Sequence, residues 1–309
     1  MANEVKLNKP WLVFVWPGMG HVAISAGYYL VAKLGMHILT EFPAHELFDV
    51  EHVEVKDGLI HTGRLPRSRF FAWKDPQGKH DVVVFIGEAQ PQRGRYSFCH
   101  RLIEFASKIG VERIYTFAAM ATPMHHEAES QVFAAAADPE TLSELKQLDL
   151  KILEDGNIGG LNGILLGVAA ERGLRGACLL GEMPHIFAQL PYPKASMAVL
   201  KVFKTIANIE LDFTELSEQV EEMDQKLGEL LEQMEKTIGQ QMPAEDEPVA
   251  PEPVEEETVS LEDQQRIERL FAQANQDRST AYELKRELDR LGIYRDYEDR
   301  FLDLFKKPQ

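Results

Sequence analysis

Short, almost continuously apolar runs alternate with amphipathic stretches over the first two hundred residues. Runs such as LVFVW and VVVFI are typical of strands that are covered on both faces. We expect strands at 11–16, 36–41, 69–73, 81–86, 113–117, 131–135 and 177–181, and helices at 22–34, 96–109, 139–148 and 161–172. Gly110 and Gly173 stand where helices commonly stop. The alternation predicts an α/β fold, with a mainly parallel sheet flanked by helices.

From Ala195 the apolar spacing changes to alternating steps of three and four residues, which continue to Met234. This is the heptad spacing of a helix that packs along one seam. Asp212 and Glu215 have the spacing of a capping box, so we predict that one helix ends near Asn208 and that a second begins near Phe213. The second helix is acidic outside its seam. It either packs on its own domain or protrudes and pairs with another subunit or partner.

The last third of the chain contains a change of composition. Residues 243–258 include four prolines and seven acidic residues, with no basic and no aromatic residue, which predicts a disordered acidic linker. Beyond it we expect a small helical region, in which Thr280 and Glu283 start one helix as a capping box and Gly292 ends it. Its apolar face comprises Ile267, Leu270, Phe271, Leu284, Leu288, Leu291, Phe301, Leu304 and Phe305. A bundle of fewer than about 50 residues is marginally stable alone, so this region should dock onto another surface. The expected division is 1–242, 243–258 and 259–309.

Charge is concentrated in one region of the 309-residue chain. The formal net charge is −17, and residues 210–258 hold 17 acidic residues against two basic ones, which leaves −2 for the remainder. No basic cluster balances this field, which disfavours nucleic-acid binding; we interpret Arg64, Arg67 and Arg69 as a solvated loop. The polar N-terminus and the absence of a long apolar run predict a cytoplasmic protein that does not bind membranes. Cys99 and Cys178 are interpreted as buried thiols.

The first candidate site is the turn after the opening strand. Gly18, Gly20, His21 and the residues around them match G-x-G-x-x-A, and Glu41 ends the next strand where a ribose-binding acid would stand. Pro17, however, separates the turn from the strand, and no later residues compose a hydride-transfer site. We therefore favour a turn that starts a helix and lines a cleft over a turn that binds a nicotinamide or flavin cofactor.

A second candidate site is the stretch GNIGGLNGILL. Asn157, Gly159, Gly160 and Asn162 form a loop before a helix of small residues, and the first N–H groups of that helix could bind an anion or a carbonyl. Close packing explains the glycines equally well.

Two carboxylates follow strand ends, where α/β folds place their sites. They are Glu182, in GEMPH, and Glu88, in IGEAQP, for which no acid–base partner can be named. His125 and His126 do not have the spacing of H-E-x-x-H, so we expect no metal site. No nucleophile or phosphate-loop motif occurs.

Three of these stretches together resemble the proteasome-assembly-chaperone family in its bacterial and archaeal branch. They are the strand, turn and helix start at 14–30, the GNIGGLNGILL loop, and GEMPH…PYPKAS leading into LDFTEL. The resemblance covers about residues 10–239. The family often has Asn where this chain has His21. Some members are labelled ATP-grasp or carboxylate–amine ligase, which these residues do not support.

The resemblance implies a phosphorylase/hydrolase-like three-layer α/β sandwich that forms homo-oligomers. Eukaryotic relatives bind proteasome α-subunits and are not enzymes. Some archaeal relatives dock through a hydrophobic-Tyr-X tail, and residues 305–309 here have a different pattern.

Two functions remain open at this stage. The first is a non-catalytic, oligomeric, assembly-chaperone-like protein with an unidentified client and no cofactor, whose partner surface involves the heptad helix and the C-terminal helices. The second is an enzyme of the nucleoside-phosphorylase or ligase type, or a nucleotide-binding protein, that uses a cleft at Gly18–Gly20 and Asn157–Asn162. A dinucleotide oxidoreductase is a third, weaker possibility.

Overall fold

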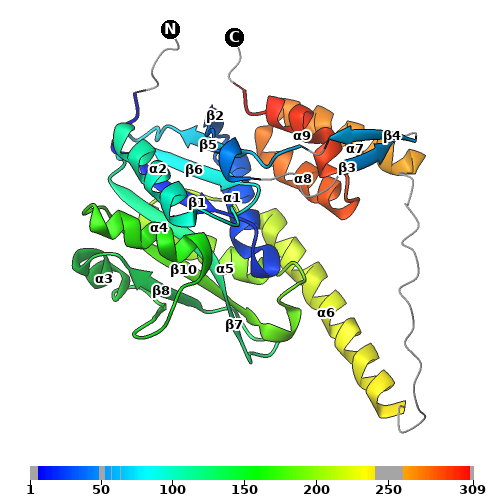
Figure 1. The fold of residues 1–309 in the computed structure, drawn as a ribbon. Coiled ribbons are helices and arrows are strands. Elements are labelled where there is room, and N and C mark those ends of the chain that lie inside the picture. Colours follow the sequence, from blue (N-terminus) through cyan, green and yellow to red (C-terminus); the bar gives the residue numbers. More distant parts are fainter. Residues whose placement is uncertain (1–5, 49–52, 57, 63, 241–259, 307–309) are drawn as a thin grey trace.

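The computed structural model describes residues 6–48, 53–56, 58–62, 64–240 and 260–306 (Figure 1). Its centre is an eight-stranded sheet with the order β2-β5-β6-β1-β7-β10-β8-β9. The strands are β1 (Trp11–Val15), β2 (His37–Glu41), β5 (Ser68–Trp73), β6 (Val82–Gly87), β7 (Arg113–Thr122), β8 (Val132–Ala136), β9 (Lys151–Ile152) and β10 (Arg175–Pro184).

The sheet is mixed but mostly parallel. β6, β1, β7 and β10 run parallel at its centre, and β9 runs parallel to β8. The remaining pairings, β2 with β5, β5 with β6 and β8 with β10, are antiparallel.

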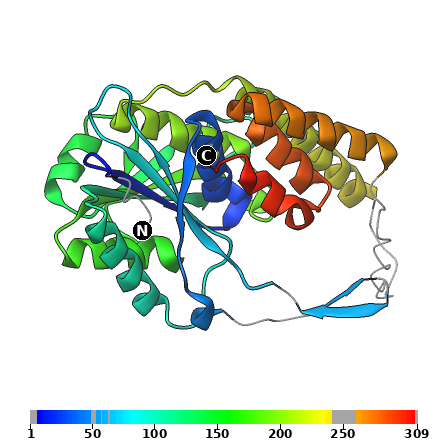
Figure 2. The same ribbon diagram turned by 90° about the horizontal axis from the view of Figure 1, so that it is seen from above.

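Helices cover both faces of this sheet, as Figure 2 shows from above. α2 (Arg95–Lys108) and α4 (Gly160–Glu171) pack on one face, and α1 (Val22–Lys33) and α5 (Pro193–Ala207) pack on the other. Along β1, Leu12 and Phe14 belong to the hydrophobic core on the face covered by α2 and α4, while Val13 and Val15 belong to the core on the face covered by α1 and α5. A strand that is buried on both faces requires a continuously apolar sequence, which is why the pattern predicted it correctly. The predicted α/β fold is confirmed.

The predicted elements are present, with some differences in extent. β7 and β10 continue to Thr122 and Pro184, well beyond their predicted ends, and pair in parallel over ten residues. α3 (Pro139–Leu145) is shorter than expected. Two features were not predicted: the short β9, and a hairpin formed by β3 (Val53–Lys56) and β4 (Leu59–Thr62). The hairpin sequence, VEVKDGLIHT, does combine alternation with an Asp-Gly turn signal.

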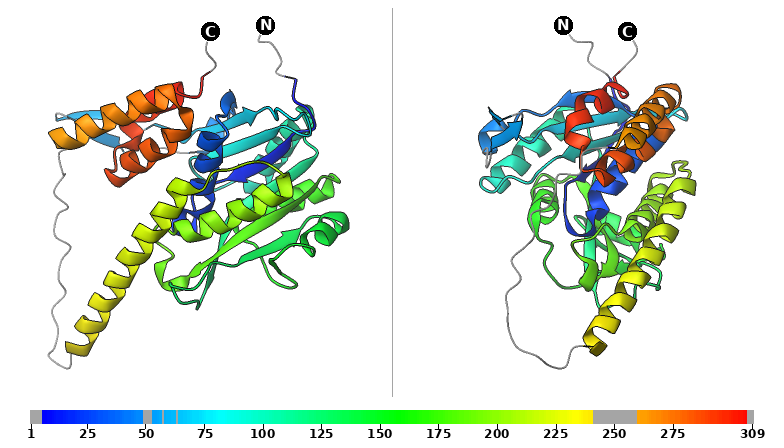
Figure 3. Two further views of the ribbon diagram at one scale, coloured as in Figure 1. Left: turned by 180° about the vertical axis from the view of Figure 1, so that it is seen from behind. Right: turned by 90° about the vertical axis from the view of Figure 1, so that its right-hand side faces the viewer.

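The long helical region divides where it was predicted to divide. α5 ends at Ala207, followed by Asn208 with a left-handed φ of 48°, and α6 spans Thr214–Gln240. The proposed capping box does not form: Asp212 accepts hydrogen bonds from the Thr214 amide and hydroxyl, two residues on, and Glu215 pairs with Lys33 at 2.5 Å. Leu216, Val220 and Leu227 are buried, so the first part of α6 packs on its own chain. Its far end projects beyond the sheet in both views of Figure 3.

Three helices follow, as expected: α7 (Leu261–Gln276), α8 (Ala281–Arg290) and α9 (Tyr294–Asp303). They dock on their own chain, against α1 and the β2–β5 edge of the sheet. The Tyr29 and Tyr282 rings meet edge to face at 4.7 Å, and the Ile38 amide on the edge strand donates to the Phe305 carbonyl. α8 begins directly after Thr280 and ends before Gly292, as predicted, but the capping box does not form, because the Thr280 hydroxyl donates to the Asp277 carbonyl. The linker predicted at 243–258 lies outside the described residues.

Candidate functional site at the carboxyl ends of the parallel strands

The first glycine turn is a short 3-10 helix, Met19–His21, between β1 and α1. Gly20 has φ +59°, and a Cβ placed there would stand 2.6 Å from Met183 Sδ. Both the backbone conformation and the close approach of Met183 therefore favour glycine. His21, with φ +50°, is exposed directly before α1.

Three successive N–H groups of this turn donate to carbonyls of the protein itself. Gly20 N–H donates to the Ala188 carbonyl at 2.9 Å, His21 N–H donates to the Gly18 carbonyl, and Val22 N–H donates to the Met19 carbonyl. A dinucleotide-binding turn would instead direct such groups at a pyrophosphate. The hydrogen bonding supports the interpretation of the turn as a helix start.

Gln90 joins this turn to the second candidate loop. Its Nε2 donates to the Pro17 carbonyl at 3.4 Å, and its Oε1 accepts from the Leu161 N–H at 3.2 Å, at the start of α4. Gln90 was not among the predicted site residues, although it follows Glu88 by two residues in the same loop. Gly160, with φ +69°, lies against the Gln90 side chain, so the loop 156–162 and the Gly18–Gly20 turn are neighbours.

The two asparagines of that loop lie differently. Asn157 is exposed, whereas Asn162 is half-buried. Among the described residues, the buried Asn162 Oδ1 has no hydrogen-bond partner. Gly159 precedes the helix without a side-chain cap.

Glu182 has a local structural role. Its carboxylate accepts from the Thr122 hydroxyl at 2.9 Å and from the Gln131 N–H at 3.4 Å, and only 8% of the residue is exposed. His185 Nδ1 lies 3.1 Å from the Thr122 carbonyl. Both side chains thus hold the loop between β7 and β8.

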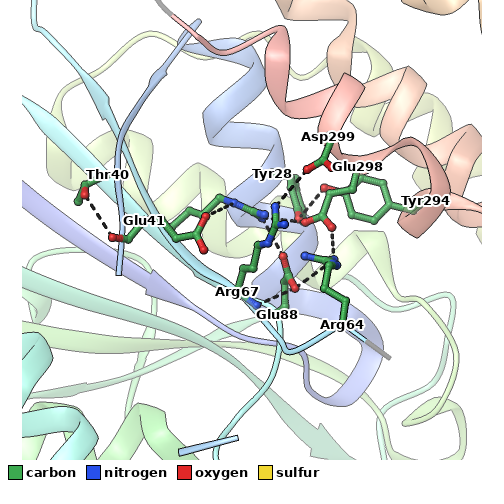
Figure 4. A network of polar contacts seen from close by, with 10 residues as sticks. Tyr28, Thr40, Glu41, Arg64, Arg67, Glu88, Tyr294, Glu298 and Asp299 are labelled. Atoms are coloured by element: carbon green, nitrogen blue, oxygen red, sulfur yellow. Dashed lines mark hydrogen bonds and ion pairs between the residues drawn. The ribbon is translucent and has the colours of Figure 1, made fainter. Parts of the chain in front are cut away.

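Glu88 lies in a different set of contacts, which Figure 4 shows. It accepts from the Arg67 N–H and from Arg69 Nη1, and the same guanidinium reaches Glu298 of α9. The interpretation of Arg64, Arg67 and Arg69 as a solvated loop is therefore wrong. Arg69 is only 5% exposed, because its partner Glu298 arrives from a helix 229 residues later.

The two histidines do not form a metal site. His125 is exposed and lies 3.6 Å from Glu127, and the His126 carbonyl accepts from Lys194 Nζ at 2.5 Å. Within the described ranges, no group of three or more His, Cys, Asp or Glu side chains is arranged to hold a metal ion.

The cysteines are buried thiols, as predicted. Burial raises the pKa of both Cys99 and Cys178 to about 12, which keeps the thiolate form scarce near neutrality.

Three exposed apolar side chains stand on two neighbouring turns at this edge of the sheet. Met19 is 45% exposed, Ile186 58% and Leu190 38%. The turns that carry them are joined because Gly20 donates to Ala188 and accepts from the Tyr192 N–H. We call Met19, Ile186 and Leu190 the strand-end patch. Clustered exposed apolar groups are typical of protein-contact surfaces.

No helix in the part of the chain that the structure describes combines the length and apolar character needed to cross a bilayer.

Comparison with known proteins gives one family. A model of the PAC2 family matches residues 13–231. Uncharacterized protein MJ1210 of Methanocaldococcus jannaschii is 28% identical over 247 residues, which cover 78% of this chain and 92% of MJ1210.

Two solved structures show the same fold. Pyrococcus furiosus PbaB, described as an archaeal proteasome activator, has a TM-score of 0.62 at 24% identity, with 72% of this chain and 94% of PbaB covered. The Mycobacterium tuberculosis proteasome-assembly chaperone homologue Rv2125 has a TM-score of 0.62 at 20% identity, with 71% and 94% covered. At these identities the likeness bears on the fold alone.

Proposed function

The chain belongs to the PAC2 family, and from this premise we propose that it is a non-catalytic, oligomeric protein that binds other proteins in the manner of an assembly chaperone. The descriptions of PbaB as a proteasome activator and of Rv2125 as a proteasome-assembly chaperone homologue support a protein partner. The identity of the client stays open.

One observation carries the proposal: the strand-end edge presents apolar side chains, while the Gly20, His21 and Val22 N–H groups of its first turn are already engaged. Gly20 N–H is bonded to Ala188, and the neighbouring Met19 and Ile186 side chains face solvent. A small-molecule site needs a few free polar groups that converge on one point, whereas a protein interface needs an exposed apolar centre.

The proposal includes a homo-oligomer in the cytoplasm, built from an α/β domain (1–242), an acidic linker (243–258) and C-terminal helices (259–309). The end of the family match at residue 231 is consistent with the first of these boundaries.

The strand-end patch can be tested by binding. Purified full-length chain carrying Met19→Asp and Ile186→Asp should lose captured partners in a pull-down, because a charge in an apolar interface centre is costly to bury. Ile60→Asp, at a side chain 75% exposed on the β3–β4 hairpin, is the matched control and should keep them. Equal capture by both variants would argue against the proposal.

A second candidate, a nucleotide or nucleoside site, is favoured by one contact. Gln90 brings the Gly18–Gly20 turn beside the 156–162 loop, as a shared cleft would require. A thermal-shift screen with nucleotides, nucleosides, phosphate and nicotinamide cofactors tests it, since a ligand of the folded state raises the Tm. A reproducible shift that Gln90→Ala removes would support this candidate.

A further inference from the structure

Two carboxylates from distant parts of the chain meet where the C-terminal helices dock. Glu88 follows β6, and Glu298 lies in α9. Arg69 Nη1 donates to Glu88 Oε1 and to Glu298 Oε1, at 2.7 Å in each case. Arg64 Nη2 also pairs with both carboxylates, and lies 3.4 Å from Glu88 Oε2 (Figure 4).

This cluster is largely withdrawn from water. The side chains of Glu298 and Arg69 are 2% and 6% exposed, and that of Glu88 is 18% exposed. Around them stand charged and titratable groups from every neighbouring element: Glu41 of β2, Tyr28 of α1, Arg67 before β5, Lys285 and Asp289 of α8, and Tyr294 and Asp299 of α9.

In this buried site the two carboxylates raise each other's tendency to hold a proton, while Arg64 and Arg69, which pair with both, act in the opposite direction. Burial, together with the hydrogen bond and charge of Glu298, raises the pKa of Glu88 to about 7. The pKa of Glu298 is held below its usual range; burial opposes this shift, but hydrogen bonds from Glu88 and Arg69 outweigh it. In the docked state the Glu88–Glu298 pair therefore takes up a proton more readily than an isolated carboxylate does.

We propose that Glu88 and Glu298 form a proton-linked latch, which holds the C-terminal helices on the α/β domain when Glu88 is protonated and loosens when Glu88 is ionised. This inference stands independently of the proposed function.

The latch controls access to a surface that belongs to the family domain. The docked helices cover Tyr28 and Tyr29 of α1, and the Phe305 carbonyl accepts a hydrogen bond from the Ile38 N–H on the edge strand β2. They lie outside the family match, which ends at residue 231. PbaB and MJ1210, which are matched over nearly their whole lengths, leave about a quarter of this chain uncovered. The C-terminal helices are therefore a segment outside the matched domain that covers one of its faces.

The pH dependence follows from linkage. When the helices leave, the pKa of Glu88 returns toward its ordinary value of 4.5, so docking takes up a proton between about pH 4.5 and about pH 7. Through Glu88 the docked state weakens as the pH rises through this window and does not change above it. Docking also lowers the pKa of Glu298, which weakens the docked state at still lower pH, so docking is strongest near the lower end of the window. One proton gives at most about a tenfold change in the opening equilibrium per pH unit.

Hydrogen exchange of the full-length chain, followed by mass spectrometry, tests the latch. Protection factors of α9 and of α1, corrected for the intrinsic pH dependence of exchange, should fall by about tenfold between pH 5.5 and pH 7.5. Glu88→Gln, whose amide is permanently neutral and can donate to Glu298, should abolish this fall. Glu298→Gln should reduce it, because Glu88 then loses its like-charged neighbour while its burial remains.

Glu268→Gln is the matched control, since Glu268 pairs with Arg300 on the exposed side of the C-terminal helices. It should keep the wild-type pH dependence. Two outcomes would overturn the proposal. One is wild-type protection that does not change over this range, and the other is a fall in both latch variants as large as the fall in the wild-type protein. Because two latch variants are used, misfolding of either one leaves the test intact.

Discussion

Gly20 and Met183 are in such close contact that a Cβ on Gly20 would lie 2.6 Å from Met183 Sδ. The contact joins the turn after β1, which carries Met19, to the end of β10, directly before the turn that carries Ile186 and Leu190. Gly20 also adopts a φ of +59°, which side chains disfavour.

Gly20→Ala should therefore destabilise the protein by about 1–3 kcal/mol, from left-handed strain and displacement of Met183. Urea unfolding followed by circular dichroism measures it. Gly18→Ala is the matched control: Gly18 is extended, a Cβ there would meet nothing within 4 Å, and the change should stay within about 0.5 kcal/mol. Equal losses in the two variants would contradict the packing argument.

Removing Arg69 should be far more costly than removing an exposed arginine. Arg69→Met leaves Glu88 and Glu298 buried with less compensation, and breaking such a cluster typically costs about 3–5 kcal/mol. Arg172→Met, which breaks an exposed pair with Glu104, should cost less than about 1 kcal/mol. Denaturant unfolding of both variants at pH 7 gives the comparison. Similar midpoints for the two would show that the Arg69 cluster contributes little.

The sheet could be predicted from the sequence because its signal is local. VVVFI is apolar at every position, and a strand buried on both faces needs that composition wherever the rest of the chain lies. The β3–β4 hairpin had a local signal as well, Asp57-Gly58 between alternating residues, which was overlooked.

The surroundings of the candidate residues could not be predicted in this way. Arg69 looks solvated in the sequence and Glu88 looks like a cleft carboxylate without a partner, because the residue that meets both, Glu298, lies more than 200 residues away. The position of Gln90 between two loops likewise depends on the order of the strands rather than on any motif.

The cysteines should be unreactive in the native protein. Because burial raises the pKa of Cys99 and Cys178 to about 12, thiolate stays scarce from pH 7 to pH 9. A thiol-reactive chromogenic disulfide should therefore label neither residue quickly in buffer at pH 8, and both in denaturant. Fast labelling of the folded chain would mean that one of these thiols is accessible and activated.

Removal of residues 241–309 should leave a folded α/β domain with an adhesive face. The deleted helices contribute Tyr282, Tyr294 and Phe301, which cover the tyrosines of α1, so truncation exposes Tyr28 and Tyr29 together. An apolar patch of this kind promotes self-association. Far-UV circular dichroism should show a folded protein, while light scattering should show association that grows with concentration.

Tyr28→Ser in the truncated chain should reduce that association. In the described residues, the aromatic rings that contact Tyr28 are Tyr294 and Phe301, and both belong to the deleted helices. If the truncated chain stayed as monodisperse as the full-length protein, or if Tyr28→Ser had no effect, the C-terminal helices would not be acting as a cover for this face.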